Sequence, residues 1–114
     1  MRDALGSAAL DALGDPHRRA IVEILGGGRR SVQEIADQLP ISRPAVSRHL
    51  RLLKQAGLVA DQPEGTRRRY ELRADGVEAV RAYFVQVWGE AATRFQIAAE
   101  NTAPNASTQR QDER

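Results

Sequence analysis

The segment from Ser42 to Gly57 constrains the fold most strongly, because it predicts one helix with two chemically opposite faces. Ser42 is a favourable N-cap residue, Pro44 is tolerated in the first helical turn, and Gly57 fits the position after the last turn. At about 100° per residue, one narrow arc carries the apolar residues Val46, Leu50 and Leu53. The opposite arc carries Ser47, Arg48, Arg51, Lys54 and Gln55. We therefore expect one face to pack on a core while the other presents guanidinium groups outward.

Length and composition limit the chain to one small globular domain. Its 114 residues, of which 41% are apolar and 28% charged, can bury roughly 60 to 70% of the unfolded surface. We expect the domain to span residues 1–101 and a disordered polar tail to follow at 102–114. The chain has no cysteine, and no apolar run approaches the roughly 20 residues that a membrane span needs. Since the N-terminal segment carries acidic residues where a signal peptide is apolar, we expect a cytoplasmic protein without a membrane partner.

Capping residues divide the domain into helices and a hairpin. Asp15 followed by Pro16 predicts the start of one helix, and Ser31 with Glu34 forms a capping box for the next. After Gly57, two short runs separated by "EGT" predict a β-hairpin. The expected fold class is mainly α with a small β-hairpin, and its elements are five helices at about 3–13, 16–25, 32–39, 43–56 and 75–101 and a two-stranded wing at 58–72.

Positive charge is concentrated in the middle of the chain. The net charge is only +2, but residues 29–69 hold nine basic side chains against four acidic ones. Because each Lys or Arg placed against a phosphate releases condensed counterions, this concentration favours a polyanionic partner. A solvated face without any partner explains the charge equally well, so the interpretation depends on how the elements are arranged.

The order of the elements predicts a winged helix-turn-helix. A helix, a three-residue turn at 40–42, a cationic helix and a basic hairpin follow one another. The major groove of DNA is about 12 Å wide and admits one α-helix, whose N-terminal and outward residues reach the base edges. The hairpin, with Arg67, Arg68 and Arg69 near its tip, suits the phosphate backbone beside that groove.

Three segments carry a resemblance to a known family: "LGDPHRRAIVEIL", "SVQEIADQLPISRPAVSRHLRLLKQAGLV" and "EGTRRRYEL". In this order and spacing, over about residues 8–98, the chain resembles the ArsR/SmtB family of bacterial transcriptional repressors. The resemblance implies a sequence-specific DNA-binding regulator, expected to be a repressor, that binds a palindromic operator as a homodimer. It places the helix at 43–56 in the major groove and the wing at 58–72 on the phosphate backbone.

The same resemblance suggests roles for individual side chains. The expected base-reading residues are Ser42, Arg43, Ser47 and Arg48, and the expected backbone contacts are Arg51, Arg67, Arg68 and Arg69. Arg48 is the first choice for a base edge, since one guanidinium can donate two hydrogen bonds to guanine. His49 borders the buried arc and is expected to line the core or to contact a phosphate, while His17 is expected on the surface.

The C-terminal helix carries an apolar stripe that one small domain cannot cover. Val77, Phe84, Ala91 and Ala98 recur every seven residues, with further apolar side chains between them. The resemblance implies a dimer built from the first and last helices, and such a dimer would cover this apolar stripe. The expected interface residues are Leu5, Val77, Val80, Phe84, Val87, Trp88, Ala91 and Phe95.

The sequence departs from the metal-sensing members of that family. Those relatives bind metals through cysteine pairs in the third helix or Asp and His clusters on the last helix, and this chain has neither. We therefore expect no metal site and no cofactor. Release from DNA then depends either on an unknown small-molecule effector, apolar or anionic, or on the protein level alone. The effector would bind near Tyr83, Phe84, Trp88 and Phe95.

Two other classes of function fit the sequence less well. An enzyme is disfavoured, because the chain has no cysteine nucleophile, no Gly-x-Ser-x-Gly motif and no phosphate-binding glycine loop. A protein- or RNA-docking module without specific DNA binding is the more serious alternative, since winged helices are reused for several purposes. Such a module would carry apolar anchors on the outward arc of the 43–56 helix, where this chain has charged and polar side chains.

Overall fold

The computed structural model describes residues 2–102 and the side chains of residues 6–101. Its elements are α1 (Arg2–Ala12), α2 (Pro16–Gly26), β1 (Arg30–Ser31), α3 (Val32–Ala36), α4 (Arg43–Gln55), β2 (Val59–Glu64), β3 (Arg67–Leu72), α5 (Ala74–Phe84), η1 (Val85–Gly89) and α6 (Glu90–Thr102). The chain forms two compact units, with a boundary between Tyr83 and Phe84. Residues 103–114 of the expected polar tail lie outside the described residues.

The predicted N-caps of α2, α3 and α4 are confirmed. Asp15 caps α2, with Pro16 in its first turn, and Ser42 caps α4. Ser31 and Glu34 form the reciprocal capping box of α3. These side chains satisfy backbone N–H groups that have no partner inside their own helix. The α3 helix has five residues and ends earlier than the sequence pattern predicted.

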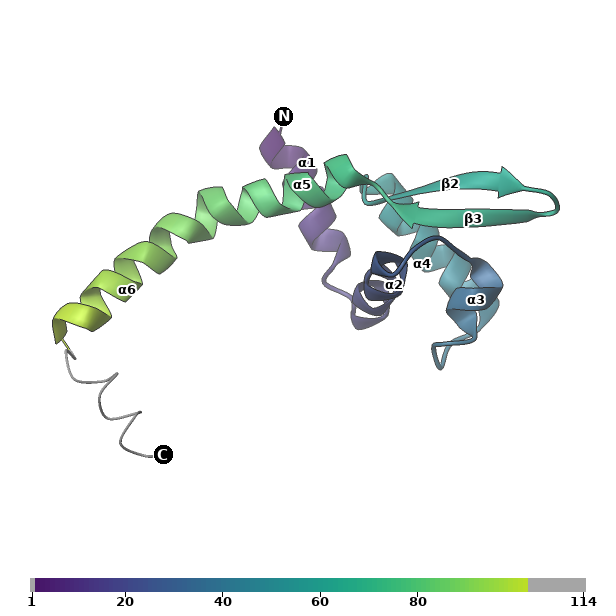
Figure 1. Ribbon diagram of the computed structural model, residues 1–114, viewed down its shortest axis with the longest axis horizontal. Coiled ribbons are helices and arrows are strands. Elements are labelled where there is room, and N and C mark those ends of the chain that lie inside the picture. Colours follow the sequence, from purple (N-terminus) through teal and green to yellow (C-terminus); the bar gives the residue numbers. More distant parts are fainter. Residues whose placement is uncertain (1, 103–114) are drawn as a thin grey trace. The chain divides into compact units, whose positions relative to one another are not determined.

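The first unit encloses one hydrophobic core beneath the strands, with α2, α3 and α4 gathered beside the sheet (Figure 1). The predicted apolar arc of α4 is fully buried, since Val46, Leu50 and Leu53 are each 0% exposed. Burial of one such side chain stabilises a fold by about 1.5–3 kcal/mol, so this face fixes the orientation of α4. The other members of the buried cluster are Ala9, Ile21, Leu25, Ile35, Leu58 and Val59.

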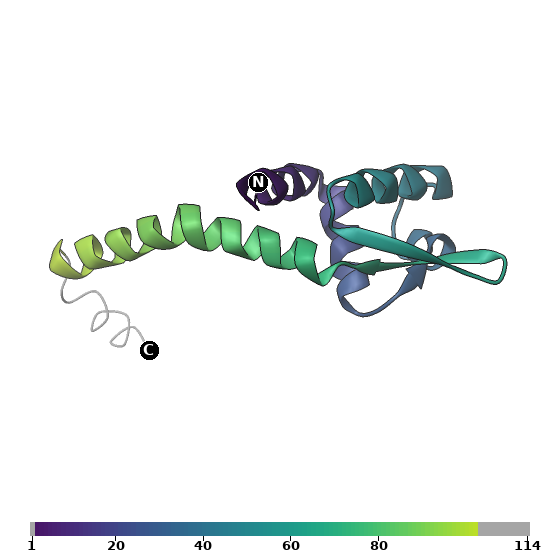
Figure 2. The same ribbon diagram turned by 90° about the horizontal axis from the view of Figure 1, so that it is seen from above.

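The wing belongs to a three-stranded antiparallel sheet with the strand order β1-β3-β2. The prediction of a two-stranded wing was therefore incomplete, because β1 adds the pairs Arg30–Tyr70 and Ser31–Arg69. A strand of two residues is too short to show the alternation by which strands are recognised in a sequence. The β2–β3 loop, which turns at Gly65 with a φ of +62°, projects away from the helices in both views (Figures 1 and 2).

Close backbone contacts hold α5 within the first unit. Gly57, after α4, has a φ of +82°, a left-handed conformation that favours glycine. A Cβ atom on Gly76 of α5 would clash with the carbonyl oxygen of Gly57. A Cβ atom on Gly6 of α1 would lie 2.8 Å from the carbonyl oxygen of Ala79. Glycine is therefore required where α5 meets both the end of α4 and α1.

The helix predicted at 75–101 is present, but it contains a π-helical segment that the sequence did not predict. The α5 helix ends at Phe84, the π-helical segment η1 covers Val85–Gly89, and α6 begins at Glu90. Within this region the Thr93 hydroxyl donates a hydrogen bond to the Gly89 carbonyl (2.9 Å). A π-helical turn closes through i→i+5 bonds, and the seven-residue apolar repeat contains no signal for it.

Most of the expected dimer-interface residues are exposed in the single chain. Trp88 and Phe95 are the most exposed of the aromatic ones, at 58% and 77%. The exposed members are Val77, Phe84, Val87, Trp88, Ala91 and Phe95. Val80 instead packs partly buried against the core, and the side chain of Leu5 lies outside those described. None of the described helices combines the length and apolar character that a membrane span requires.

Candidate nucleic-acid interface

The outward face of α4 presents arginines that have no internal partner. Arg43, Arg48 and Arg51 are exposed, and none of them forms an ion pair with another residue of the described chain. Ser47 is half-buried beside them. The Ser42 hydroxyl oxygen accepts the capping hydrogen bond of α4 at 3.2 Å, and its O–H hydrogen is left to donate elsewhere.

Asp61 of β2 binds two cations that lie on the same side of the protein. Its Oδ1 atom is 2.6 Å from Lys54 Nζ of α4, and its Oδ2 atom is 2.7 Å from an Arg68 guanidinium nitrogen of β3. The hydrogen bond from Lys54 outweighs partial desolvation and, with the charges of Lys54 and Arg68, holds the pKa of Asp61 below its ordinary 3.8. Asp61 is therefore ionised at neutral pH and neutralises part of the positive charge of α4 and the wing.

The three wing arginines differ in how many carboxylates bind them. Arg69 is bound by two carboxylates, at 3.1 Å from Glu34 Oε1 and 3.2 Å from Glu64 Oε2. Arg68 is bound by Asp61, as described above. Arg67, next to the turn, is exposed and has no ion pair with any residue whose side chain is described. Arg67 can therefore bind a phosphate without first losing a carboxylate partner.

A hollow of about 320 Å³ lies where α3, α4 and the wing tip meet. Its lining residues are Ser31, Val32, Gln33, Arg43, Thr66, Arg67 and Arg68. A second hollow, of about 430 Å³, continues along α4 and is lined by Val32, Arg43, Pro44 and Ser47. Three arginines line the first hollow, so it suits an anion such as a phosphate of the nucleic-acid backbone.

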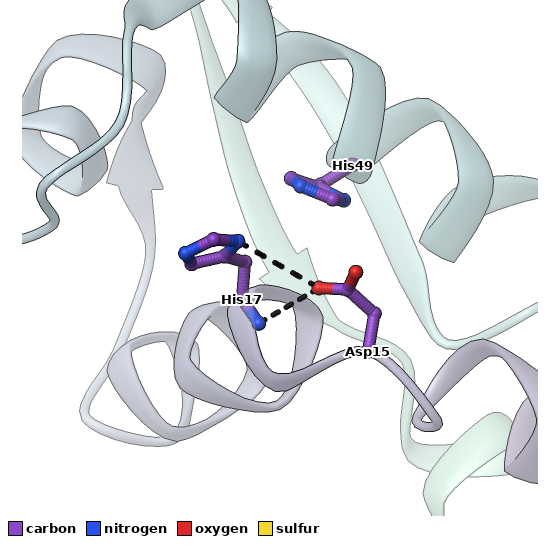
Figure 3. Close-up of side chains that lie close together, drawn as sticks. All are labelled: Asp15, His17 and His49. Carbon is purple, nitrogen blue, oxygen red and sulfur yellow. Dashed lines mark hydrogen bonds and ion pairs between the residues drawn. The ribbon is translucent and has the colours of Figure 1, made fainter.

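His49 of α4 lies against the start of α2 and away from the outward arginines. Its ring is half-buried, with its centroid 5.7 Å from that of His17, and Asp15 lies beside both rings (Figure 3). An Arg18 guanidinium nitrogen is 3.5 Å from His49 Nδ1. Burial is the main cause that lowers the pKa of His49; the Asp15 charge opposes this effect and the Arg18 charge adds to it. His49 is therefore neutral at physiological pH.

Sequence reasoning missed the role of Asp61, although a signal for it exists. In the β2–β3 register Asp61 stands opposite Tyr70, so Arg68 is its diagonal neighbour on the same face of the sheet. Diagonal cross-strand pairs are within reach of long side chains. Counting back from the glycine turn would have placed this carboxylate beside Arg68, whereas the approach of Lys54 depends on how α4 packs.

Comparison with known proteins shows that the chain is similar to transcriptional regulators. A family model described as a helix-turn-helix domain matches residues 13–62. The HTH-type transcriptional regulator Rv2034 of Mycobacterium tuberculosis is 51% identical over 87 residues, which cover 76% of this chain and 81% of Rv2034. The crystal structure of a possible transcriptional regulator for arsenical resistance aligns with a TM-score of 0.70 and 36% identity, over 80% of this chain and 95% of that one.

A third similar protein is a homodimeric winged helix-turn-helix DNA-binding domain from Mycobacterium bovis, a possible ArsR-family transcriptional regulator. It aligns with a TM-score of 0.61 and 27% identity over 87% of this chain and 82% of that chain. The α3–turn–α4 arrangement with its adjoining sheet is the winged helix-turn-helix of these regulators, which are DNA-binding proteins and not enzymes. The chain belongs to the ArsR/SmtB family of winged helix-turn-helix transcriptional regulators.

Proposed function

We propose that the protein represses transcription as a homodimer that places one α4 helix from each subunit in the major groove of a palindromic operator. The observation that supports this most directly is a set of four exposed arginines on α4 and the wing tip without an acidic partner among the described residues: Arg43, Arg48, Arg51 and Arg67. A guanidinium without an internal partner binds a phosphate or a base without first breaking an ion pair.

Sequence is read by the first two turns of α4. Arg48 is the strongest candidate, because a guanidinium that donates two hydrogen bonds to guanine O6 and N7 discriminates by about 1–3 kcal/mol. Ser42, Arg43 and Ser47 lie at the same end of the helix and supply further contacts. His49 is omitted from the proposed contacts, because it lies against α2.

Arg51 and the wing contact the phosphate backbone. Arg67 is available for a phosphate as it stands, whereas Arg68 and Arg69 must exchange a carboxylate partner for one. The hollow that Arg43, Arg67 and Arg68 line gives such a phosphate a position between α4 and the wing. Contacts of this kind fix the register of a protein on DNA without reading its sequence.

The homodimer is supported by apolar surface that one chain leaves uncovered. Monomeric soluble proteins rarely expose large apolar patches, yet Trp88 and Phe95 are mainly exposed. On the first unit, an apolar hollow of about 240 Å³ is lined by Leu13, Val22, Leu58, Val77, Val80 and Arg81. The similar M. bovis domain is homodimeric. A two-fold dimer would match a palindrome with its recognition helices about 34–36 Å apart.

The test begins with the selection of bound duplexes from a random pool, which gives the half-site and its spacing. Arg48→Ala should then weaken binding to the selected operator by about 1–3 kcal/mol per half-site and leave binding to a scrambled duplex unchanged. Arg51→Ala is the matched control, since a lost phosphate contact should weaken both complexes alike. Equal losses on both duplexes for Arg48→Ala would assign Arg48 to the backbone and contradict the proposed reading.

A further inference from the structure

One side-chain cluster on the first unit is not used by the proposed DNA contacts. Asp15, the N-cap of α2, and His17 lie beside His49 of α4, and all three side chains converge (Figure 3). Each residue offers one potential metal-binding atom, and these atoms lie within 4.8 Å of one another. The chain contains only two histidines, and the fold brings both of them to this position.

We propose that Asp15, His17 and His49 bind one divalent transition-metal ion of the zinc type and thereby link the start of α2 to α4. Two imidazole nitrogens and one carboxylate oxygen form a donor set that suits zinc, with water in the fourth position. Zinc ligands about 2.1 Å from the ion lie about 3.4 Å apart in a tetrahedral site, so the cluster must contract slightly. His17 can provide this movement, because its side chain is 43% exposed.

The Asp15 carboxylate has one oxygen to spare for a metal. Its Oδ1 atom accepts hydrogen bonds from the backbone N–H groups of His17 (2.8 Å) and Arg18 (3.2 Å). Its Oδ2 atom has no hydrogen bond to any residue of the described part of the chain. The helix cap and a metal bond can therefore exist at the same time.

Arg18 opposes metal binding at His49. One Arg18 guanidinium nitrogen lies 3.5 Å from His49 Nδ1, and its Nε donates a hydrogen bond to the Ala12 carbonyl. The Arg18 guanidinium places a positive charge beside His49 and therefore repels a metal ion bound to that imidazole. Removal of this guanidinium should therefore strengthen metal binding.

The test measures zinc affinity of the full chain, without a histidine tag, by titration against a chromophoric chelator. The wild type should bind one Zn²⁺ per chain, and His17→Ala and His49→Ala should each weaken binding at least about tenfold. Asp15→Asn should do the same while the fold is kept, because Asn is an equally good N-cap residue. Asp11→Asn, which removes an exposed carboxylate from α1, is the matched control and should bind as the wild type does.

Three further measurements separate a three-residue site from weak surface binding. Arg18→Gln should bind Zn²⁺ more tightly than the wild type. Zinc at about 100 times its dissociation constant should raise the thermal midpoint of the wild type by about 10 °C, and that of His17→Ala by at most about half as much at the same zinc concentration. Unchanged affinity in Asp15→Asn, or wild-type affinity in the double variant of His17→Ala and His49→Ala, would overturn the proposal. A shift of only one imidazole in an NMR titration would also overturn it.

Discussion

Replacement of Asp61 by Asn should tighten DNA binding, because this carboxylate neutralises two cations near the proposed DNA surface. Lys54 and Arg68 both bind Asp61, and their side chains are more than half exposed, at 56% and 58%. Asparagine has nearly the same shape, but it carries no charge and cannot hold two cations. The substitution therefore frees Lys54 and Arg68 for phosphates and leaves the hairpin backbone as it is.

The size of the effect follows from counterion release. Each phosphate contact contributes about 0.9 to the slope of log K against log salt concentration. One additional contact per subunit would steepen the slope of a dimer by about 1.8, and two additional contacts by about 3.6. The cost in folding free energy should be small, about 0.2–1 kcal/mol for each ion pair with an exposed cation.

The pH dependence of stability gives an independent check on the Asp61 ion pairs. The pKa of Asp61 is lowered in the folded protein, chiefly by its hydrogen bond from Lys54. Its contribution to stability is therefore present above the unfolded value near 3.8 and is lost as the pH falls through the folded value. In Asp61→Asn the free energy of unfolding should therefore fall less steeply as the pH is lowered, as measured by urea unfolding at several pH values.

The binding assay is fluorescence anisotropy with a random duplex over a series of salt concentrations. Glu23→Gln is the control, because it removes an equal charge from an exposed residue of α2 that has no ion pair with a described residue. An unchanged slope together with an unchanged affinity in Asp61→Asn would show that Lys54 and Arg68 do not reach the DNA. An equally steep slope in Glu23→Gln would assign the effect to net charge and refute the role of the ion pairs.

Three other substitutions test the wing, the packing and the dimer. Arg67→Ala should weaken binding to all duplexes alike and reduce the dimer slope by about 1.8, and an unchanged slope would exclude a phosphate contact. Gly76→Ala should destabilise the fold by about 1–3 kcal/mol in urea unfolding, because its Cβ meets the Gly57 carbonyl, whereas Gly26→Ala, with open space around it, should not. Trp88→Glu should sediment as a monomer and lose operator binding, and a stable dimer would refute the interface.

The caps and the core of the first unit could be predicted because they are local or periodic features. Ser42 is recognised as a cap from the residues next to it, and the apolar arc of α4 is recognised from the helical spacing of its residues. Neither feature depends on any other part of the chain. The β1 strand and the π-helical segment have no such pattern. Strand β1 forms because β3 offers it an edge, and the seven-residue repeat is the same with or without η1.

The charges of the site could be identified from the sequence, but most of their partners, apart from Asp61 diagonal to Arg68 in the hairpin, could not. Arg67, Arg68 and Arg69 are adjacent and look equivalent as a sequence, yet the strand register and the position of α3 give them different environments. The histidine cluster is a similar case. His17 and His49 approach each other only because the core packs α4 against α2, so a search for ligands along one helix does not find them.

The distribution of internal ion pairs also bears on how tightly the protein binds DNA of any sequence. A cation held by a carboxylate gives up that partner before it binds a phosphate, so Lys54, Arg68 and Arg69 add less to non-specific affinity than their number implies. Arg48 has no such restraint and lies on the helix proposed to read the bases. Because phosphate contacts form with any sequence, the internal ion pairs lower the affinity for the operator and for random DNA alike, and the ratio of the two affinities depends on Arg48 and the other base contacts. Asp61→Asn should therefore bind random DNA and the operator more tightly by similar factors, and unequal factors would contradict the assignment of Lys54 and Arg68 to the backbone.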